Sequence, residues 1–135
     1  MVNRILIAAL LVFFASIAKG QGPTPQQAAA FIGTWVFDMT EPPNSKETIR
    51  IWDDGGKVAA SVQVMQFPSR NVTGIIKDGD LLVLTVSHDA DPPFVENGIP
   101  IWGIITLTVD GDTMKLAQLM ELSYTVKRGT AKRTR

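Results

Sequence analysis

The single histidine, His88, is the one side chain whose unperturbed imidazole titrates near neutral pH. It stands in the run Ser87-His88-Asp89, which contains the residue types of a catalytic triad. Neighbouring side chains of a β-strand point to opposite faces, however, so three adjacent residues cannot converge on one reacting group. We therefore expect His88 to be hydrogen-bonded at a strand end. An enzyme that uses His88 with an acid from residues 89–96 is the least favoured function.

Metal and cofactor chemistry is not indicated by the composition. The chain has no Cys and one His, which argues against a structural zinc site. The turns Asp78-Gly79-Asp80 and Asp110-Gly111-Asp112 are too short for an EF-hand-type calcium loop, which needs oxygen ligands at several fixed positions and a closing Glu. No Gly-rich phosphate loop is present. The sequence therefore predicts no metal site and no cofactor.

Residues 89–98 form the longest connection expected after the N-terminal helix, and they combine three carboxylates with Phe94. Pro92-Pro93 would stiffen this segment, because proline fixes its own φ angle. Long ordered loops over a barrel mouth often gate a pocket. Phe94, which we expect to be exposed, and the neighbouring His88 are therefore candidate ligand contacts. The alternative is a plain connector between two strands.

The elements that must position these groups begin at Gly33. From there onward the side-chain pattern repeats every two residues, and β-branched and aromatic residues are frequent. This pattern predicts strands. Asp-Gly pairs separate several of them, because Gly, and Asp more readily than most residues, tolerates the positive φ of a tight hairpin. Eight strands are expected, at 34–40, 47–52, 57–67, 71–77, 81–88, 99–109, 113–119 and 122–128.

The order of these strands in space follows from their short connections, which predict that each strand pairs with the one before it. Eight such strands would leave exposed edges unless the sheet closed. The predicted fold is therefore all-β, an eight-stranded antiparallel up-and-down meander barrel. A short N-terminal helix precedes it, since Thr24-Pro25-Gln26-Gln27 fits a capping box and Gly33 can end the turn.

The first 20 residues are interpreted as a signal peptide and excluded from the fold. Arg4 precedes an uncharged apolar run, Ile5–Ala18, and small residues follow at cleavage spacing, as Ser16-x-Ala18 or Ala18-x-Gly20. A retained membrane anchor is the alternative, but spanning takes about 20 apolar residues and Lys19 ends the run early. Residues 21–135 then form a single exported domain without disulfides, which favours the bacterial periplasm or the extracellular space.

Charge is unevenly distributed along this domain. Of the 13 basic residues, Arg4 and Lys19 leave with the signal peptide, so 11 basic residues face 13 acidic ones, a net charge of about −2. A basic tail ends the chain, formed by Lys127, Arg128, Lys132, Arg133 and Arg135. Such a tail can touch nucleic acid, an anionic membrane or an acidic partner. We favour a solvated terminus plus the end of the last strand, with no nucleic-acid partner and no stable membrane insertion after cleavage.

A short helix followed by Gly33-Thr34-Trp35 at the start of the first strand resembles the lipocalins and the wider calycin group. The likeness is greatest to the small lipocalin-like domains of bacterial secreted proteins. It implies that Trp35 plugs one end of a barrel and that an Arg from the last strand packs across it, either Arg128 or Arg133. The chain departs from larger members in lacking a Thr-Asp-Tyr-like second motif, a disulfide and a long C-terminal helix.

The resemblance places Trp35 inside, and the alternation then places Phe37 and Met39 on the same interior face. Trp102 and Trp52 alternate with aliphatic neighbours, so each suits either the core or the surface. We expect an exported, non-enzymatic, lipocalin-like barrel that binds a small apolar ligand. The candidate contacts are Trp35, Phe37, Met39, His88, Phe94 and Trp102. The rival is a packed barrel that acts through its surface, as an inhibitor or an envelope-assembly partner.

Overall fold

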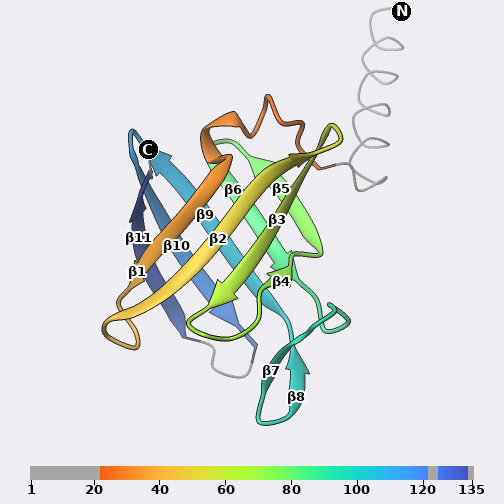
Figure 1. Ribbon diagram of the computed structural model, residues 1–135, viewed down its shortest axis with the longest axis vertical. Coiled ribbons are helices and arrows are strands. Elements are labelled where there is room, and N and C mark those ends of the chain that lie inside the picture. Colours follow the sequence, from red (N-terminus) through yellow and green to blue (C-terminus); the bar gives the residue numbers. More distant parts are fainter. Residues whose placement is uncertain (1–21, 122–124, 134–135) are drawn as a thin grey trace, which may run out of the picture.

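One large antiparallel sheet, curled into a half-barrel, dominates the computed structural model of the chain (Figure 1). The structure describes residues 22–121 and 125–133. Nine strands pair in the order β4-β3-β2-β1-β11-β10-β9-β6-β5, and β7 and β8 form a separate hairpin at one end. The strands are β1 Gly33–Met39, β2 Ser45–Asp54, β3 Lys57–Val64, β4 Arg70–Asn71, β5 Gly74–Asp78, β6 Leu81–Val86, β7 Phe94–Glu96, β8 Ile99–Ile101, β9 Gly103–Asp110, β10 Thr113–Met120 and β11 Val126–Lys132.

The predicted all-β class is confirmed, but the closed eight-stranded barrel is not, because β4 and β5 stand at opposite ends of the strand order. The predicted strand 71–77 is broken into two at Val72 and Thr73. The amide of Val72 donates to the carbonyl of Ala60 in β3 at 3.0 Å, whereas the amide of Thr73 donates to Thr85 in β6 at 2.8 Å. These two residues bridge the sheet's two ends. Beyond them β3 and β5 are not paired, so the sheet keeps an open seam.

The N-terminal helix is reduced to turns at 25–28 and one 3₁₀ turn, Ala29–Phe31. The predicted capping box does form. The amide of Thr24 donates to Gln27 Oε1 at 2.9 Å, and the amide of Gln27 donates to Thr24 Oγ1 at 3.2 Å. A longer helix is prevented because the chain must turn after Phe31 to enter β1, where Gly33 has a φ of 140°.

The core lies on the concave face of the sheet, where the period-two pattern places its apolar residues. In β1, Trp35, Phe37 and Met39 are buried, as the alternation predicts, and their outward neighbours are exposed. The opposite wall is contributed by β6, β9 and β10. Side chains with under 2 % exposure fill the interior, and they include Trp35, Phe37, Ile49, Ile51, Leu82, Leu84, Ile105, Leu107 and Met114.

The last strand is shifted relative to the prediction, and it converts part of the basic tail into sheet. β11 runs from Val126 to Lys132, not from 122 to 128, and it pairs with β1 on one side and β10 on the other. Gly129 packs tightly against β1 in this register: a Cβ on it would lie 2.5 Å from Met39 Sδ and 3.1 Å from the carbonyl oxygen of Asp38. Residues 122–124 and Arg135 lie outside the described part of the chain.

The predicted signal peptide, residues 1–20, also lies outside the described residues. Across positions 22–121 and 125–133, none of the helical segments has the length and apolar character needed to cross a bilayer.

Candidate functional site

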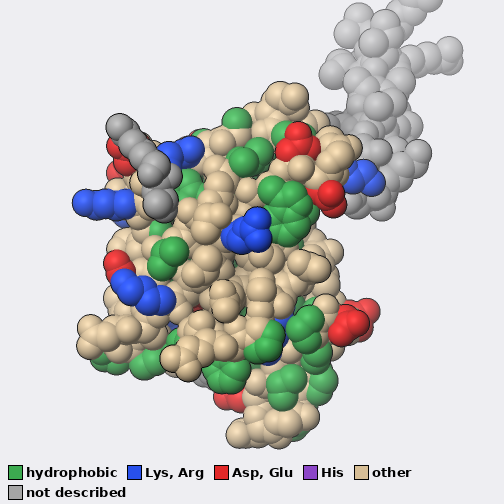
Figure 2. All heavy atoms as spheres, viewed as in Figure 1, with side chains coloured by type: hydrophobic (Ala, Val, Ile, Leu, Met, Phe, Trp, Pro, Cys, Tyr) green, Lys and Arg blue, Asp and Glu red, His purple; other side chains and the backbone are tan. Residues whose placement is uncertain are grey.

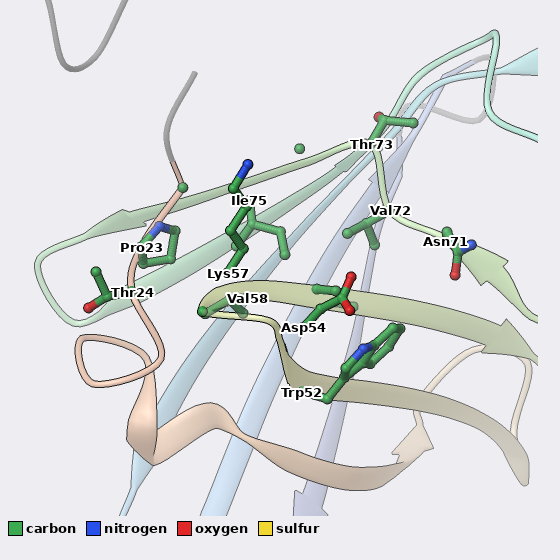
Figure 3. A pocket seen from close by; sticks show the side chains of 15 residues that line it. Pro23, Thr24, Trp52, Asp54, Lys57, Val58, Asn71, Val72, Thr73 and Ile75 are labelled. Carbon is green, nitrogen blue, oxygen red and sulfur yellow. The ribbon is translucent and has the colours of Figure 1, made fainter. Parts of the chain in front are cut away.

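The open seam between β3 and β5 forms a groove of about 640 Å³ (Figure 3). Pro23 and Thr24 lie at one end of this space and Val72 and Thr73 at the other, with Val58 and Ile75 on its two long sides. The groove exists because the sheet pairs across the seam only near Val72. Its lining residues are Gly22, Pro23, Thr24, Trp52, Asp54, Gly56, Lys57, Val58, Ala59, Ala60, Asn71, Val72, Thr73, Gly74 and Ile75.

The inner wall of the seam groove is apolar and continuous with the core. Val58, Val72 and Ile75 are partly buried and pack against core residues, and Ala60 is itself buried. Outside this wall lie polar groups, among them the exposed Asp54 at the end of β2 and Lys57 at the start of β3. The arrangement can hold an apolar body against the inner wall while a polar end remains near solvent.

An aromatic ring and the N-terminal segment complete the groove. Trp52 is half-buried, and the guanidinium of Arg50 lies 5.8 Å from its ring centre. Gly22 lies so close to β5 that a Cβ on it would stand 3.2 Å from the carbonyl oxygen of Ile75. Nothing in the sequence pattern indicated these contacts, because they depend on how far β3 and β5 diverge.

A second hollow, of about 820 Å³, lies between residues 42–46 and residues 65–67. It is lined by loop residues and strand ends, of which Phe67 and Met65 are strongly exposed. None of its lining residues is an apolar member of the buried core. Despite its larger volume we regard it as a surface depression, whereas the seam groove reaches the core.

Trp35 occupies one end of the half-barrel, beside the N-terminal turn. Its ring is 1 % exposed, and its Nε1 donates to the carbonyl of Phe31 at 2.8 Å. The guanidinium of Arg133 lies 5.0 Å from the ring centre and donates to the carbonyl of Ala30 at 2.6 Å. Of the two candidate arginines, Arg133 therefore takes the position across Trp35, and Arg128 is exposed in β11.

His88 is paired with a residue that the sequence analysis missed. Its Nε2 contacts the Glu121 carboxylate, and that carboxylate also accepts the backbone amide of Trp102 at 3.2 Å. Ser87 instead donates to Asp89, which holds the pKa of the Asp89 carboxyl below its usual range. Ser87 thus pairs with Asp89 and His88 with Glu121, so the run Ser87-His88-Asp89 does not form a triad. Glu121 is 33 positions from His88, so no local motif could have revealed it.

Phe94 is buried, at 5 % exposure, so the expectation of an exposed ring is wrong. The segment 89–98 is not a plain loop either, since Phe94 begins the β7–β8 hairpin and faces the core. The Arg70 guanidinium covers the ring at 5.1 Å, and Arg70 Nε donates to the carbonyl of Pro93 at 2.8 Å. Phe94 and Ile101 are the buried apolar residues of the hairpin, whereas Val95 and Ile99 are exposed. Figure 2 shows hydrophobic side chains at the surface around the hairpin, at the lower end of the view.

Glu47 is the second residue that the sequence analysis missed. It is 2 % exposed on the concave face, where its carboxylate meets the side-chain amide of Gln118. Burial raises the pKa of Glu47 to about 7, and the nearby charge of Lys127 opposes this rise. A signal was available, because Glu47 shares the inward phase of Ile49 and Ile51 in an alternating strand.

The six predicted contact residues do not meet in one place. Trp35, Phe37 and Met39 share the core behind β1, whereas His88 and Trp102 meet at Glu121 near the connection from β6 to β9. None of the six lines the seam groove. Within residues 22–121 and 125–133, no group of three His, Cys, Asp or Glu side chains could hold a metal ion.

Comparison with known proteins identifies no relative of the chain. No family model matches it, and neither a curated protein nor a solved structure is similar to it.

Proposed function

We propose that this chain is an exported, non-enzymatic, lipocalin-like domain that binds a small, mainly apolar molecule in the seam groove. The observation that carries the proposal is the groove itself. Its volume of about 640 Å³ falls within the range of small-molecule sites, roughly 300–1,000 Å³. Val58, Val72 and Ile75 give it an apolar wall that reaches the core.

The lipocalin-like part of the proposal is supported by the end closed by Trp35. The resemblance implies a buried Trp at the start of the first strand, covered by an Arg from the last strand. Here Trp35 is covered by Arg133, which lies one residue after the end of β11. The sheet supports it as well. All its strands except the two-residue β4 are at least five residues long, and these eight long strands follow one another in the order of a meander. Those eight strands would make a closed meander if β3 and β5 paired along their length.

The proposed site is the seam rather than the interior, because core side chains already occupy the interior. Phe37, Ile49 and Leu107 are fully buried there. The interior contacts expected from the sequence, with His88 and Phe94 at the hairpin end, therefore support the walls of the domain rather than touch the ligand. Export remains part of the proposal on the strength of the N-terminal sequence, and the bacterial periplasm or the extracellular space is the proposed location.

The test is a fluorescence titration of the purified domain, residues 21–135, with a panel of fatty acids and aromatic probes. Trp52 lines the groove, so ligand entry should change its emission saturably. A Trp52→Phe variant should bind with similar affinity but lose most of the signal, which separates Trp52 from Trp35 and Trp102. Flat titrations across the panel would contradict the proposal and favour the surface-acting rival, which predicts a protein partner in pull-downs from the native envelope.

A further inference from the structure

Glu47 and Gln118 form a brace across the concave face of the half-barrel. Glu47 lies in β2 and Gln118 in β10, and two strands, β1 and β11, separate them in the sheet. Their side chains nevertheless meet, because the sheet curls until these two positions face each other. Both are at least 96 % buried, with exposures of 2 % and 4 %. This contact therefore joins strands that share no backbone hydrogen bond.

The surroundings of the brace are almost entirely apolar. Phe37 of β1 stands beside Glu47 in register, and Val64 of β3 stands on its other side. Gly129 of β11 leaves room above Phe37, since a Cβ there would lie 3.4 Å from Phe37 Cβ. Lys127, opposite Gln118 in register, is the charged group that acts on Glu47 among the described residues.

The chemistry of the pair has two arrangements that differ by one proton. A protonated Glu47 donates its O–H to the amide oxygen of Gln118. An ionised Glu47 can only accept, so the Gln118 amide must rotate and donate its NH₂ group instead. The second arrangement also leaves a negative charge in an apolar interior with Lys127 as its counter-charge, and burying an ion costs far more than burying its neutral form.

We propose that Glu47 and Gln118 form a proton-controlled brace. It holds the start of β2 against the end of β10 when Glu47 is protonated and releases it when Glu47 is ionised. When the brace loosens, the first residues of β2 and β11 separate from the end of β10, and water then reaches the Glu47 carboxylate. The proposal concerns the opening of the fold and is independent of what the seam groove binds.

The direction of the pH effect follows from the pKa of Glu47, which is about 7 in the closed form against an ordinary value of 4.5. The closed form therefore holds a proton that the opened form has released across this interval. The contribution of this proton to the stability of the closed form is complete below about pH 4.5. It decreases as pH rises and is lost above about pH 7. A difference of about 2.5 pKa units sets an upper limit of roughly 300-fold on the change in the opening equilibrium.

The test is amide hydrogen exchange of the purified domain between about pH 5 and pH 8, corrected for intrinsic rates. The expected result is that amides of residues 45–49 and 126–130 lose protection by one to two orders of magnitude as pH rises to 7. Glu47→Gln, which keeps the hydrogen bond without a titrating group, should flatten this dependence. Asp38→Asn is the matched control on the neighbouring strand, because Asp38 is exposed, and it should leave the dependence intact.

Lys127→Met supplies a second, independent readout. Removing the counter-charge should shift the midpoint of the pH dependence upward and deepen the loss of protection. The proposal is overturned if Glu47→Gln keeps the wild-type pH dependence, or if protection changes equally in every strand, which would indicate global unfolding. If Glu47→Gln does not fold, an unchanged midpoint in Lys127→Met overturns it.

Discussion

The guanidinium of Arg133 lies over the ring of Trp35, 5.0 Å from its centre, although 98 positions of sequence separate the two residues. The same guanidinium donates to Ala30, and the indole donates to Phe31, so both side chains tie the N-terminal turn to the sheet. The end of the half-barrel is thus closed by one aromatic ring, one cation and two backbone carbonyls.

Arg133→Ala is expected to lower the free energy of unfolding by about 2 kcal/mol, because it removes a cation–π contact and a charge-assisted hydrogen bond. Arg133→Lys should recover only part of the loss, because the ammonium group keeps the charge but cannot stack on the ring as a planar guanidinium does. Urea unfolding measures both. Arg128→Ala, on the exposed face of the same strand region, should change stability by less than about 0.5 kcal/mol. Equal losses at both arginines would contradict the role given to Arg133.

Arg70→Ala should loosen the β7–β8 hairpin. Arg70 contacts the Phe94 ring and donates to the carbonyls of Pro93 and Pro68, at 2.8 and 2.9 Å. Loss of these contacts should speed amide exchange of residues 94–101 roughly tenfold, which corresponds to about 1.4 kcal/mol, and leave β9 and β10 protected. Lys77→Ala, a surface change on β5, serves as the control. Unchanged exchange in the hairpin would show that Phe94 holds it without Arg70.

Ile75→Ala and Ile76→Ala separate the seam groove from the surface beside it. Ile75 lines the groove, whereas its neighbour Ile76 is 61 % exposed and does not. Ile75→Ala should weaken probe binding by about fivefold to tenfold, as expected for losing roughly 1 kcal/mol of apolar contact. Ile76→Ala should leave the affinity unchanged. Circular dichroism and urea unfolding check that both variants keep the fold, and equal affinities would place the ligand elsewhere.

Gly129→Ala should destabilise the domain by about 1–3 kcal/mol, because the added methyl meets Met39 Sδ at 2.5 Å and the backbone oxygen of Asp38 at 3.1 Å. The sulfur can move, but the backbone oxygen cannot without displacing β1. Thr130→Ala, one residue further on the exposed face, should cost less than about 0.5 kcal/mol. Thermal unfolding of the two variants gives the comparison, and a neutral Gly129→Ala would contradict the tight β1–β11 packing.

Processing of the N-terminus is expected when the full chain is expressed in a bacterium with a functional export pathway. Cleavage should follow Ala18 or Gly20, so the mass of the exported protein should match a chain beginning at Lys19 or Gln21. Leu10→Arg, which places a charge in the apolar run, should block export and leave the full-length mass. An unprocessed wild-type chain in the membrane fraction would favour the retained anchor.

Much of the fold was predictable from local patterns. Period-two alternation located the long strands within a few residues, but it missed β7, and the predicted strand 99–109 is divided at Trp102 into β8 and β9. The hairpin turns at Asp78-Gly79-Asp80 and Asp110-Gly111-Asp112 appear where the Asp-Gly pairs predict them. Gly79 and Gly111 indeed have positive φ angles, 56° and 61°. The inward phase of Trp35, Phe37 and Met39 was confirmed for the same reason: a strand with one buried face must place alternate residues on it.

The candidate sites were not predictable in this way, because each joins residues that are distant in sequence. Glu121 meets His88, and Gln118 meets Glu47, only through the curl of the sheet. The choice between Arg128 and Arg133 depended on the register of β11 with β1 and β10, which the strand's own sequence does not specify. The alternation within a strand indicates which face of the sheet a side chain occupies, but it does not indicate which residue of another strand that side chain contacts.

The sequence by itself determined the all-β class, the meander order and the inward-facing residues, because these follow from side-chain alternation and short turns, which act between near neighbours. Only the tertiary structure decided whether the sheet closes, where the hairpin at Phe94 is buried and which polar groups meet inside. The physical reason is that closure depends on curvature summed over nine strands. A small divergence of β3 from β5, beyond the bridge at Val72 and Thr73, is then enough to leave a groove instead of a closed wall.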